Sequence, residues 1–256
     1  MGLVTVSEMP ATALLATARR ITVLTGAGVS TDSGIPDFRG PDGLWTRNPE
    51  AQRYVDLDLY RRDAEVRQES WRRRAAHPAL TASPNAAHQA LAGLHEQGRL
   101  RALLTQNIDG LHHRAGVPAE LVVEMHGSIR DTECLGCGER RAMSEALARV
   151  RAGEADPDCP TCGGLLKSGT VFFGQSLDTT VLGRAVEAAR DCDLFLAVGT
   201  SLSVQPVASL TGLAASHGAP VVIVNASPTP YDDIAAAVVR EPIGDVLPQL
   251  LADRAP

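Results

Sequence analysis

Lysine, long apolar runs and a secretion signal are scarce or absent in the sequence. Lys167 is the only lysine beside 23 arginines, and the formal charge is −6. We interpret the bias toward arginine as compositional, because an acidic balance argues against general nucleic-acid binding. No apolar run approaches the roughly 20 residues that a membrane span requires. Residues 1–20 lack a basic leader followed by a long apolar stretch. We therefore expect a soluble, cytoplasmic protein that binds neither membrane nor nucleic acid.

The length and the apolar pattern indicate an α/β protein. A chain of 256 residues with 44% hydrophobic residues can bury one sizeable core and a small second one. Short apolar runs that end in glycine or polar residues alternate with helical stretches, as in a doubly wound parallel sheet. Strands are expected at residues 21–25, 100–105, 121–125, 193–198, 221–224 and 236–240, and helices at 11–20, 84–98, 207–217 and 243–253. Short helices packed over the loop that follows residue 25 are expected between 41 and 84.

A loop of small residues follows the first expected strand. Gly26 and Gly28 come directly after residues 21–25, and Ser30 adds a hydroxyl. Backbone N–H groups in such a loop can approach a phosphate closely, although two glycines could equally cap a strand. The ordinary dinucleotide fingerprint has a third glycine where Thr31 stands, and no acidic residue about 20 positions on is placed for a ribose. The loop therefore predicts a nucleotide site whose contacts with the ligand differ from those of the ordinary dinucleotide fingerprint.

Polar and charged residues continue this loop and follow the later expected strands. They are Asp37, Phe38 and Arg39 in the loop; Gln106, Asn107, Ile108 and Asp109 after the second strand; His126 after the third; Gly199, Thr200 and Ser201 after the fourth; and Asn225, Ala226 and Ser227 after the fifth. Parallel sheets bind ligands at the carboxyl ends of their strands. A lone histidine at a strand end is more often structural. Here several strand ends converge with complementary chemistry, so His126 is predicted to be catalytic.

Four of the five cysteines form two Cys-x-x-Cys pairs. Cys134 and Cys137 are separated from Cys159 and Cys162 by 21 residues, and both pairs lie in glycine-rich knuckles. This set suits tetrahedral zinc, and four thiolates leave no open coordination position, so the metal is expected to be structural. Two redox pairs are the alternative, but neither pair heads a helix of a thioredoxin-like unit. Cys192 is expected to be an inert core thiol.

These features predict a Rossmann-like domain with a small insertion. The large domain is expected to contain residues 1–127 and 168–256, with a helical insertion at about 41–84. Residues 128–167 break the α/β rhythm and are expected to form a small zinc-ribbon domain. The chain returns to the large domain through an extended segment that contains Phe172 and Phe173. Adjacent residues of an extended segment face opposite sides, so one ring can join the core while the other lines a groove.

The sequence resembles the sirtuins, which are NAD-dependent protein deacylases, over nearly its whole length. The matching stretches are Gly26-Ala-Gly-Val-Ser30, Gly34-Ile-Pro-Asp-Phe-Arg39, Gly43-Leu-Trp45, Gln106-Asn-Ile-Asp109, His126-Gly127, both Cys-x-x-Cys pairs, Val171-Phe-Phe-Gly174, Gly199-Thr-Ser201 and Val224-Asn225. Each stretch alone is weakly specific, but together and in this order they are highly specific. The resemblance implies a Rossmann-like domain and a zinc domain, with NAD and an acyl-lysine peptide meeting in the cleft between them.

The resemblance also implies roles for individual residues. NAD would be bound by Gly26, Ala27, Gly28, Ser30, Asp37, Phe38, Arg39, Trp45, Gln106, Asn107, Ile108, Asp109, Gly199, Thr200, Ser201, Asn225, Ala226, Ser227 and Ile243. The edge formed by Val171, Phe172, Phe173 and Gly174 would pair with the backbone of the acyl-lysine substrate. Asn107 and Asp109 would orient the ribose and a water molecule, and neutral His126 would take a proton from a ribose hydroxyl. The products would be nicotinamide, the deacylated lysine and O-acyl-ADP-ribose.

Two other functions use the same features. ADP-ribosyl transfer to protein needs only that an acceptor side chain replaces the acyl oxygen. A zinc-ribbon binding module on an inactive NAD sensor is the non-enzymatic alternative, although every polar motif of the predicted active centre is present. Sirtuins that prefer succinyl or malonyl lysine resemble one another in a Tyr-x-x-Arg pair, and this sequence aligns Ser70 with the tyrosine and Arg73 with the arginine. Half of the pair that recognises the acidic acyl group is absent, which leaves the preferred acyl group open. Deacetylation is the expected main activity, on the basis of Asn107, Asp109 and His126.

Overall fold

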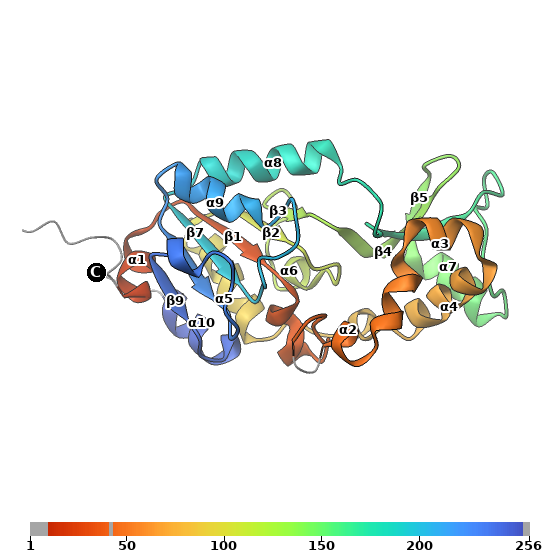
Figure 1. The fold of residues 1–256 in the computed structure, drawn as a ribbon, viewed down its shortest axis with the longest axis horizontal. Helices are drawn as coiled ribbons and strands as arrows, with labels where there is room; N and C mark the ends of the chain where they lie inside the picture. Colours follow the sequence, from red (N-terminus) through yellow and green to blue (C-terminus); the bar gives the residue numbers. More distant parts are fainter. Residues whose placement is uncertain (1–9, 41–42, 253–256) are drawn as a thin grey trace, which may run out of the picture.

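The computed structural model describes residues 10–40 and 43–252, and its main body is a parallel sheet (Figure 1). All six of its strands lie within the segments expected from the sequence. They are β1 (Ile21–Thr25), β2 (Leu100–Thr105), β3 (Val122–Glu124), β7 (Leu194–Val198), β8 (Val221–Val224) and β9 (Ala237–Val239). Short apolar runs between turn residues are a reliable strand signal, because a strand of a parallel sheet is buried on both faces.

The strand order shows where a ligand site is expected. The order β3-β2-β1-β7-β8-β9 corresponds to the order 3-2-1-4-5-6 of the Rossmann fold. β1 is the central strand: Leu24 lies opposite Leu104 of β2 on one side and Ala197 of β7 on the other. The direction of chain progression reverses between β1 and β7. The crevice outside the carboxyl ends of these two strands is therefore the expected ligand site.

Helices cover both faces of the parallel sheet (Figure 1). α1 (Ala11–Thr17), α5 (Ala86–Glu96) and α10 (Ile243–Leu251) cover one face, and α8 (Thr179–Arg190) and α9 (Ser209–Ser216) cover the other. Within β1, Val23 belongs to the first core and Leu24 to the second. Adjacent strand residues point to opposite faces. Both helical layers are therefore held to the sheet by apolar burial.

The helices differ from the expected ones at several points. The helix expected at residues 11–20 ends at Thr17, and the one expected at 243–253 ends at Leu251, while residue 253 lies outside the described part of the chain. The helix expected at 84–98 begins after Asn85, whose side chain caps it. α8 was not expected from the sequence. Its fully buried residues are all alanines, and alanine contributes little to a hydrophobic pattern.

A second, smaller sheet lies beside the first (Figure 1). Its antiparallel strands have the order β5-β4-β6, namely Arg140–Ala142, Gly127–Cys134 and Leu166–Thr170. α7 (Met143–Arg151), α3 (Leu57–Arg62) and α4 (Ala64–Ala75) belong to the same part of the molecule. Trp71 of α4 packs against Cys134, Met143 and Leu166. We call this part, without implying domain limits, the zinc module.

This packing corrects one expectation about residues 41–84. Short helices are present, but α3 and α4 pack on the zinc module and not over the glycine loop. α2 (Leu44–Arg47) is joined to that loop by backbone bonds from Leu44 and Trp45 to Asp37 and Phe38, and Ala79 of a later 3₁₀ turn packs in one cluster with Ile35 of the loop. Trp71 is the reason for the difference, because its large apolar ring is buried most completely against the small core of the zinc module.

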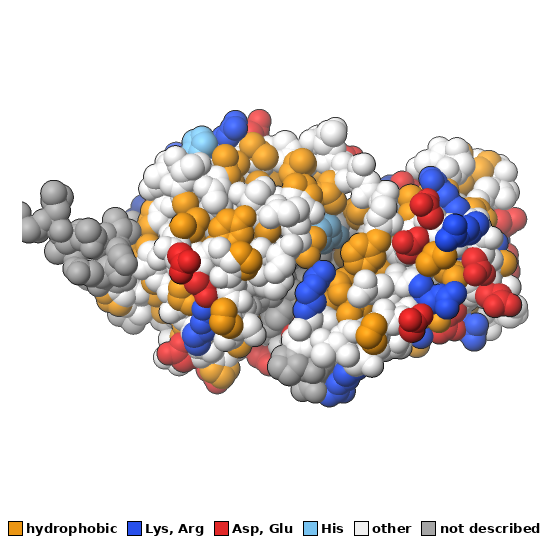
Figure 2. All heavy atoms as spheres, in the orientation of Figure 1, with side chains coloured by type: hydrophobic (Ala, Val, Ile, Leu, Met, Phe, Trp, Pro, Cys, Tyr) orange, Lys and Arg blue, Asp and Glu red, His pale blue; other side chains and the backbone are white. Residues whose placement is uncertain are grey.

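The remaining short elements are α6 (Leu111–Arg114) and 3₁₀ helices at Ala27–Ser33, Pro49–Val55, Pro78–Leu80 and Asp232–Ile234. Within the described ranges, no helix has the length and apolar character needed to cross a membrane. Figure 2 shows a hollow between the part that contains the parallel sheet and the zinc module, and histidine and basic side chains are visible in it.

Candidate functional site

The loops after β1 and β7 touch at the point where the chain order reverses. The N–H of Gly28 donates to the carbonyl of Gly199 over 2.9 Å. A Cβ on Gly26 would lie 2.7 Å from the same carbonyl oxygen, and Gly199 has a φ of +61°. A side chain at any of these positions would separate the loops or strain the backbone. The glycines of the predicted NAD site therefore have a structural role, namely the close contact of two loops.

Three backbone N–H groups of these loops are available to a ligand. Those of Ala27, Thr200 and Ser201 donate to no other residue in the described part of the chain. Ala27 begins the 3₁₀ helix Ala27–Ser33, where the first N–H groups lack intrahelical partners. Unpaired N–H groups at a helix start and at a strand end attract anionic oxygens. The crevice thus has the donor set that a pyrophosphate requires.

A buried hydrogen-bond network joins the glycine loop to the loop after β2. The Oγ of Ser30 donates to Oδ2 of Asp109 over 2.8 Å and accepts from Nδ2 of Asn107 over 3.1 Å. Asn107 also donates to the carbonyl of Gly26 at 3.1 Å, and Leu111 donates its N–H to Oδ1 of Asp109 at 2.9 Å. Both Asp109 oxygens are thus satisfied within the protein. The amide oxygen of Asn107 makes no such bond, so it is the group of this pair that can face a ligand.

Two buried histidines extend this network, and the sequence pattern did not single them out. The Nε2 of His88 lies 3.4 Å from the Oγ of Ser30, and the ring of His88 lies 4.9 Å from that of His112. His112 contacts the Oγ1 of Thr25 at 3.0 Å, while its buried Nδ1 has no partner within the described structure. Burial lowers the pKa of both histidines, that of His112 strongly. The available signal was Asn85, which forms a capping box with His88 and so directs the ring inward.

His126 stands at the end of β3 with its tautomer defined. Its Nδ1 lies 3.1 Å from the carbonyl oxygen of Gln106. A carbonyl oxygen can only accept, so Nδ1 carries the proton and Nε2 presents a lone pair. Burial lowers the pKa of His126, although the bond to Gln106 opposes this shift. The side-chain amide of Gln106 donates in turn to Thr200 over 2.8 Å. His126 is therefore a neutral base linked to the loops after β2 and β7.

A second group of predicted residues gathers around Trp45. The Phe38 ring lies 4.6 Å and the Phe173 ring 5.3 Å from the Trp45 ring, and the Arg39 guanidinium lies 4.6 Å above it. Partial burial lowers the pKa of Arg39 without an acidic partner to oppose it. Asp37 accepts from the N–H of Gly40 over 2.9 Å. The charged part of the loop is thus stacked on aromatic rings, which join it to the predicted substrate segment.

The predicted substrate edge, Val171–Gly174, is already partly paired. Phe173 donates its N–H to the carbonyl of Val55 over 2.8 Å and accepts from the N–H of Leu57 over 3.0 Å, while Val171 donates to His126. Phe172 is buried and Phe173 is 41% exposed, so the two rings do face opposite sides, as expected. No hydrogen bond to another described residue engages the backbone of Gly174. Gly174 therefore remains open to a peptide, as does the carbonyl of Val171, which accepts no hydrogen bond from another described residue.

The other predicted NAD-binding residues lie further along the sheet edge or fill the core. Asn225, Ala226 and Ser227 follow β8, where the Asn225 amide donates to the Ser227 carbonyl over 2.7 Å. Ile243 begins α10 and packs against the first core. Ile108 packs beside Leu111 and Ile129. Among the described residues, no hydrogen bond connects them with the network of Ser30, and their placement alone gives them no chemical role.

The residues aligned with the Tyr-x-x-Arg pair are already engaged. Ser70 is buried in α4. The Nε of Arg73 donates to Glu69 over 2.8 Å, and its guanidinium lies 4.3 Å above the ring of Tyr54. An arginine that is paired with a carboxylate and stacked on a ring is less available to a second carboxylate.

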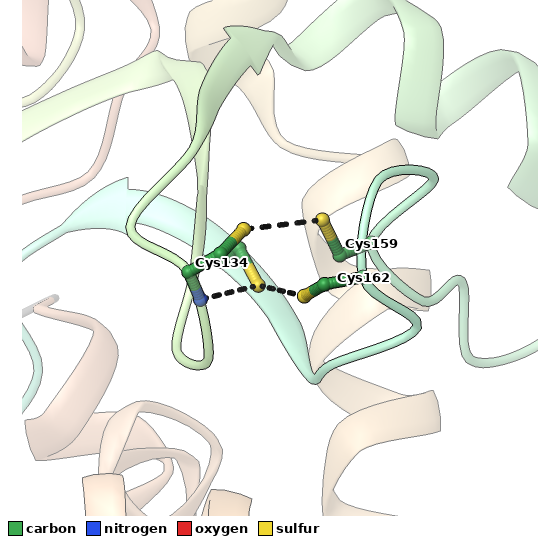
Figure 3. A group of neighbouring side chains, drawn as sticks. Cys134, Cys159 and Cys162 are labelled. Atoms are coloured by element: carbon green, nitrogen blue, oxygen red, sulfur yellow. Dashed lines mark hydrogen bonds between the residues drawn. The ribbon is translucent and has the colours of Figure 1, made fainter.

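The four paired cysteines form a metal site in the zinc module (Figure 3). Their sulfur atoms lie within 4.8 Å of one another, which suits a single tetrahedral ion. The N–H groups of Cys137 and Gly136 donate to the sulfur of Cys134, and they lower its pKa to about 6. Thiolate is the form that binds zinc. Cys192 lies apart, where burial raises the pKa of its thiol.

A groove of about 570 Å³ lies on another part of the surface, between α8 and the strands β3, β4 and β6. Glu124, Asp131 and Arg184 are among the residues that line it. It contains no residue of the loops after β1, β2 or β7. The groove therefore lies outside the predicted NAD crevice, but it borders the substrate segment, because Val171 is one of its lining residues.

Comparisons with known proteins agree with this site. The Sir2 family model matches residues 26–206. The chain is 55% identical over 231 residues to NAD-dependent protein deacetylase 2 of Streptomyces coelicolor, and the aligned region covers 90% of this chain and 96% of that protein. It is 42% identical over 236 residues to NAD-dependent protein deacetylase 1 of Bradyrhizobium diazoefficiens, with 91% of each chain covered.

Solved structures give the same result. A complex of Sir2 with a p53 peptide and NAD+ has a TM-score of 0.83 and 34% identity, and 93% of this chain and 95% of that chain are covered. A Sir2 structure with a bound acetylated peptide has a TM-score of 0.82 and 32% identity, with 93% and 94% covered. The matches extend over the parallel sheet, the site and the four cysteines. The chain belongs to the Sir2 family.

Proposed function

We propose that this protein is an NAD-dependent protein-lysine deacetylase that transfers the acetyl group to ADP-ribose and releases nicotinamide. The observation that carries the proposal is the neutral His126, whose Nδ1 donates to Gln106 and whose Nε2 is open. It stands beside the crevice at which Rossmann-type sheets bind dinucleotides. The relatives named above are deacetylases along almost the same length of chain.

The crevice supplies what NAD needs from the protein. The N–H groups of Ala27, Thr200 and Ser201 would bind the pyrophosphate. Arg39 and Trp45 would cover the site, and Asn225 and Ile243, at the ends of β8 and α10, would contact the adenosine half. When bound, NAD supplies a glycosidic carbon that the acetyl oxygen can attack while nicotinamide leaves. The buried network around Ser30 holds the walls of this site in a fixed position.

The catalytic residues divide into one base and two positioning groups. Nε2 of His126 would take a proton from a ribose hydroxyl and so allow the acetyl group to move. Asn107 would orient the ribose or a water molecule with its amide oxygen, because its Nδ2 is used on Ser30 and Gly26. Both carboxylate oxygens of Asp109 accept hydrogen bonds, one from Ser30 and one from Leu111, so Asp109 would act by holding the loop in place.

The peptide would add to the edge at Gly174 and reach the active site beside Phe173. The segment 55–57 already occupies the backbone groups of Phe173, so Gly174 and the carbonyl of Val171 are the groups that remain for a peptide strand. The exposed ring of Phe173 offers an apolar surface to the substrate. The solved Sir2 complexes with acetylated and propionylated peptides support acyl-lysine peptides as the substrate class.

These roles assign NAD binding and zinc binding to different parts of the chain. Residues 1–127 and 168–256 would form the NAD-binding domain, and residues 128–167 the zinc-binding domain, with α3 and α4 of the 41–84 insertion docked on the latter. One zinc ion held by Cys134, Cys137, Cys159 and Cys162 would be structural. We place the enzyme in the cytoplasm, with acyl-lysine proteins as its partners and without a nucleic-acid ligand.

A panel of acyl-lysine peptides, incubated with NAD and read by mass spectrometry, tests the function. Acetyl-lysine peptides should lose about 42 mass units, the difference between an acetyl group and a hydrogen atom. Nicotinamide should be released only when the peptide is present. ADP-ribose that remains covalently on protein would favour ADP-ribosyl transfer instead. Tight NAD binding without turnover on any peptide would favour the non-catalytic module.

A further inference from the structure

The outer strand of the zinc module has an unpaired edge. β6 pairs only with β4, because the strand order is β5-β4-β6. Val171, just beyond β6, donates its N–H toward β4, to His126. Carbonyls of alternate residues point to the same side of a strand. The carbonyls of Leu166, Ser168 and Thr170 therefore point to the other edge, where no strand satisfies them.

Side chains replace the missing strand at this edge. The Tyr60 hydroxyl donates to the Leu166 carbonyl over 2.6 Å. Nζ of Lys167 donates to the carbonyls of Ser168 and Thr170, both at 2.9 Å, and to Oε2 of Glu133 at 3.1 Å. An ammonium group has three N–H donors, so all of them are used. The single lysine of the chain thus saturates two adjacent carbonyls of an open edge.

The lysine is enclosed completely. Its side chain is 0% exposed, with Glu133 as its carboxylate partner. The Phe172 ring lies 5.0 Å from Nζ and meets the Tyr60 ring edge-on at 5.3 Å. Arg74, also buried, donates to the Oγ of Ser168 over 2.9 Å. Burial of a cation is unfavourable unless its hydrogen bonds and charge are matched. An apolar residue would avoid that cost, but it could not bind the two carbonyls.

These contacts end where the substrate segment begins. Thr170 precedes Val171, and Phe172 is the second residue of the Val171–Gly174 segment. The ammonium therefore holds the last carbonyl before the segment and the buried ring within it. We propose that Lys167 is a positioning residue that holds the substrate segment in the geometry that binds the acyl-lysine peptide. This inference rests on the proposed deacetylase function and adds to it the residue that determines peptide binding.

The test compares Lys167→Met with Arg67→Met in the zinc-loaded full chain. Met keeps the unbranched stem but has no donor. Arg67 stabilises the same module through Asp156 at 2.7 Å and the carbonyls of Tyr60 and Arg61, and among the described residues no hydrogen bond joins it to β6. In Lys167→Met the KM for an acetyl-lysine peptide should rise about tenfold while the KM for NAD changes less than about twofold. In Arg67→Met both KM values should stay within about twofold of the wild type, even if the melting temperature falls.

Hydrogen exchange gives a readout that does not depend on turnover. The amides of Val171 and Phe173 should exchange about tenfold faster in Lys167→Met, while amides of β2 remain unchanged. If the wild type fails to deacetylate, the proposed function fails, but this exchange result still decides the role of Lys167. If Lys167→Met does not fold, Lys167→Arg replaces it. The planar guanidinium of arginine cannot direct three donors at the same three acceptors, so the rise in peptide KM and the faster amide exchange should persist at smaller size. Wild-type peptide KM and wild-type exchange in the folded variant would overturn the inference.

Discussion

The parallel-sheet part and the zinc module are stabilised by different means. Two large apolar clusters join the helices to both faces of the parallel sheet, and β1 and β7 are buried along their whole length. The zinc module has a cluster of seven buried residues, two of which are metal-binding cysteines, and a smaller cluster of Leu57, Tyr60 and Phe172 beside it. Polar contacts also stabilise it, such as those of Lys167 with Glu133 and of Arg67 with Asp156. A core this small cannot offset the entropy of folding, so the metal is needed.

The comparison also separates chemistry from stability. The predicted base and the anion-binding N–H groups belong to the parallel-sheet part, while the peptide edge begins at the end of β6 in the zinc module. Zinc has no open position and no direct part in the reaction. Changes in one part should therefore alter turnover, and changes in the other should alter folding and peptide binding.

The largest expected effect on turnover comes from His126→Ala. Loss of the base should lower kcat by about 10²- to 10⁴-fold, since a positioned general base contributes that much. Zinc content and melting temperature should stay at wild-type values, because among the described residues the ring is hydrogen-bonded only to the Gln106 carbonyl. His217→Ala, on the exposed end of α9, is the matched control and should keep full activity. Wild-type turnover by a folded His126→Ala protein would remove His126 from the mechanism.

The largest expected effect on structure comes from Cys134→Ala. The variant should lose about one zinc ion per chain and unfold the zinc module, since the metal supplies much of its folding free energy. NAD affinity should persist in part, because the glycine loop and Gly199 lie on strands of the other sheet. Elemental analysis and calorimetric NAD titration measure the two effects, with Cys192→Ala as the control that keeps zinc. A metal-free variant that stays folded and active would contradict a structural role for zinc.

A cavity in the core of the parallel-sheet part should lower the stability of the protein without releasing zinc. Leu196 is fully buried in β7, and Leu196→Ala should lower the free energy of unfolding by about 2–5 kcal/mol. Zinc content should remain unchanged, because no cysteine of the metal site contacts this cluster. Denaturant unfolding and elemental analysis test both statements. Zinc release from a folded Leu196→Ala protein would show that the two parts are not separately stabilised.

The pH dependence of turnover should report the buried histidine. Burial lowers the pKa of His126 below its ordinary value of 6.5. The base is active only when Nε2 is unprotonated, so activity should persist as the pH falls through 6.5 and decline only below it. A kcat profile with saturating substrates measures the midpoint. An acid limb centred above pH 6.5 would mean that a different group titrates or that His126 is paired with an acid in the complex.

The smallest effect is expected at Arg73. Its guanidinium is paired with Glu69 and stacked on Tyr54, at the surface of α4. Arg73→Gln should change deacetylation by less than about twofold, since exposed ion pairs contribute little. Turnover of succinyl-lysine peptide should be low in both proteins. A large loss of desuccinylation in Arg73→Gln would show that the arginine leaves Glu69 to read an acidic acyl group.

The sequence predicted the strands and the ligand crevice better than the helices. All strands of the parallel sheet were expected, because each is a short apolar run between turn residues. α7 was not expected, because it lies between the two cysteine pairs in a stretch that was interpreted only as a break in the α/β rhythm. α8 was missed because its buried face is made of alanines. Hydrophobic periodicity shows which side of a helix is apolar but not which part of the protein that side packs against. The packing of Trp71 on the zinc module was therefore not predictable from the sequence.

The site itself was only partly predictable. Gly26, Asn107, Asp109 and His126 were expected together, because the carboxyl ends of neighbouring parallel strands meet. The bonds between them were not, since Asp109 is satisfied within the protein by Ser30 and Leu111. The pairing of Phe173 with residues 55–57 depends on a contact across more than one hundred positions of chain, which no local pattern encodes.

The stoichiometry of nicotinamide release tests the central claim most directly. The account predicts that the wild-type enzyme forms one nicotinamide for each lysine that loses its acetyl group, and none when the peptide is omitted. Both products can be counted in one reaction by chromatography and mass spectrometry. Deacetylation without NAD, or nicotinamide release that does not depend on acetyl-lysine peptide, would contradict it.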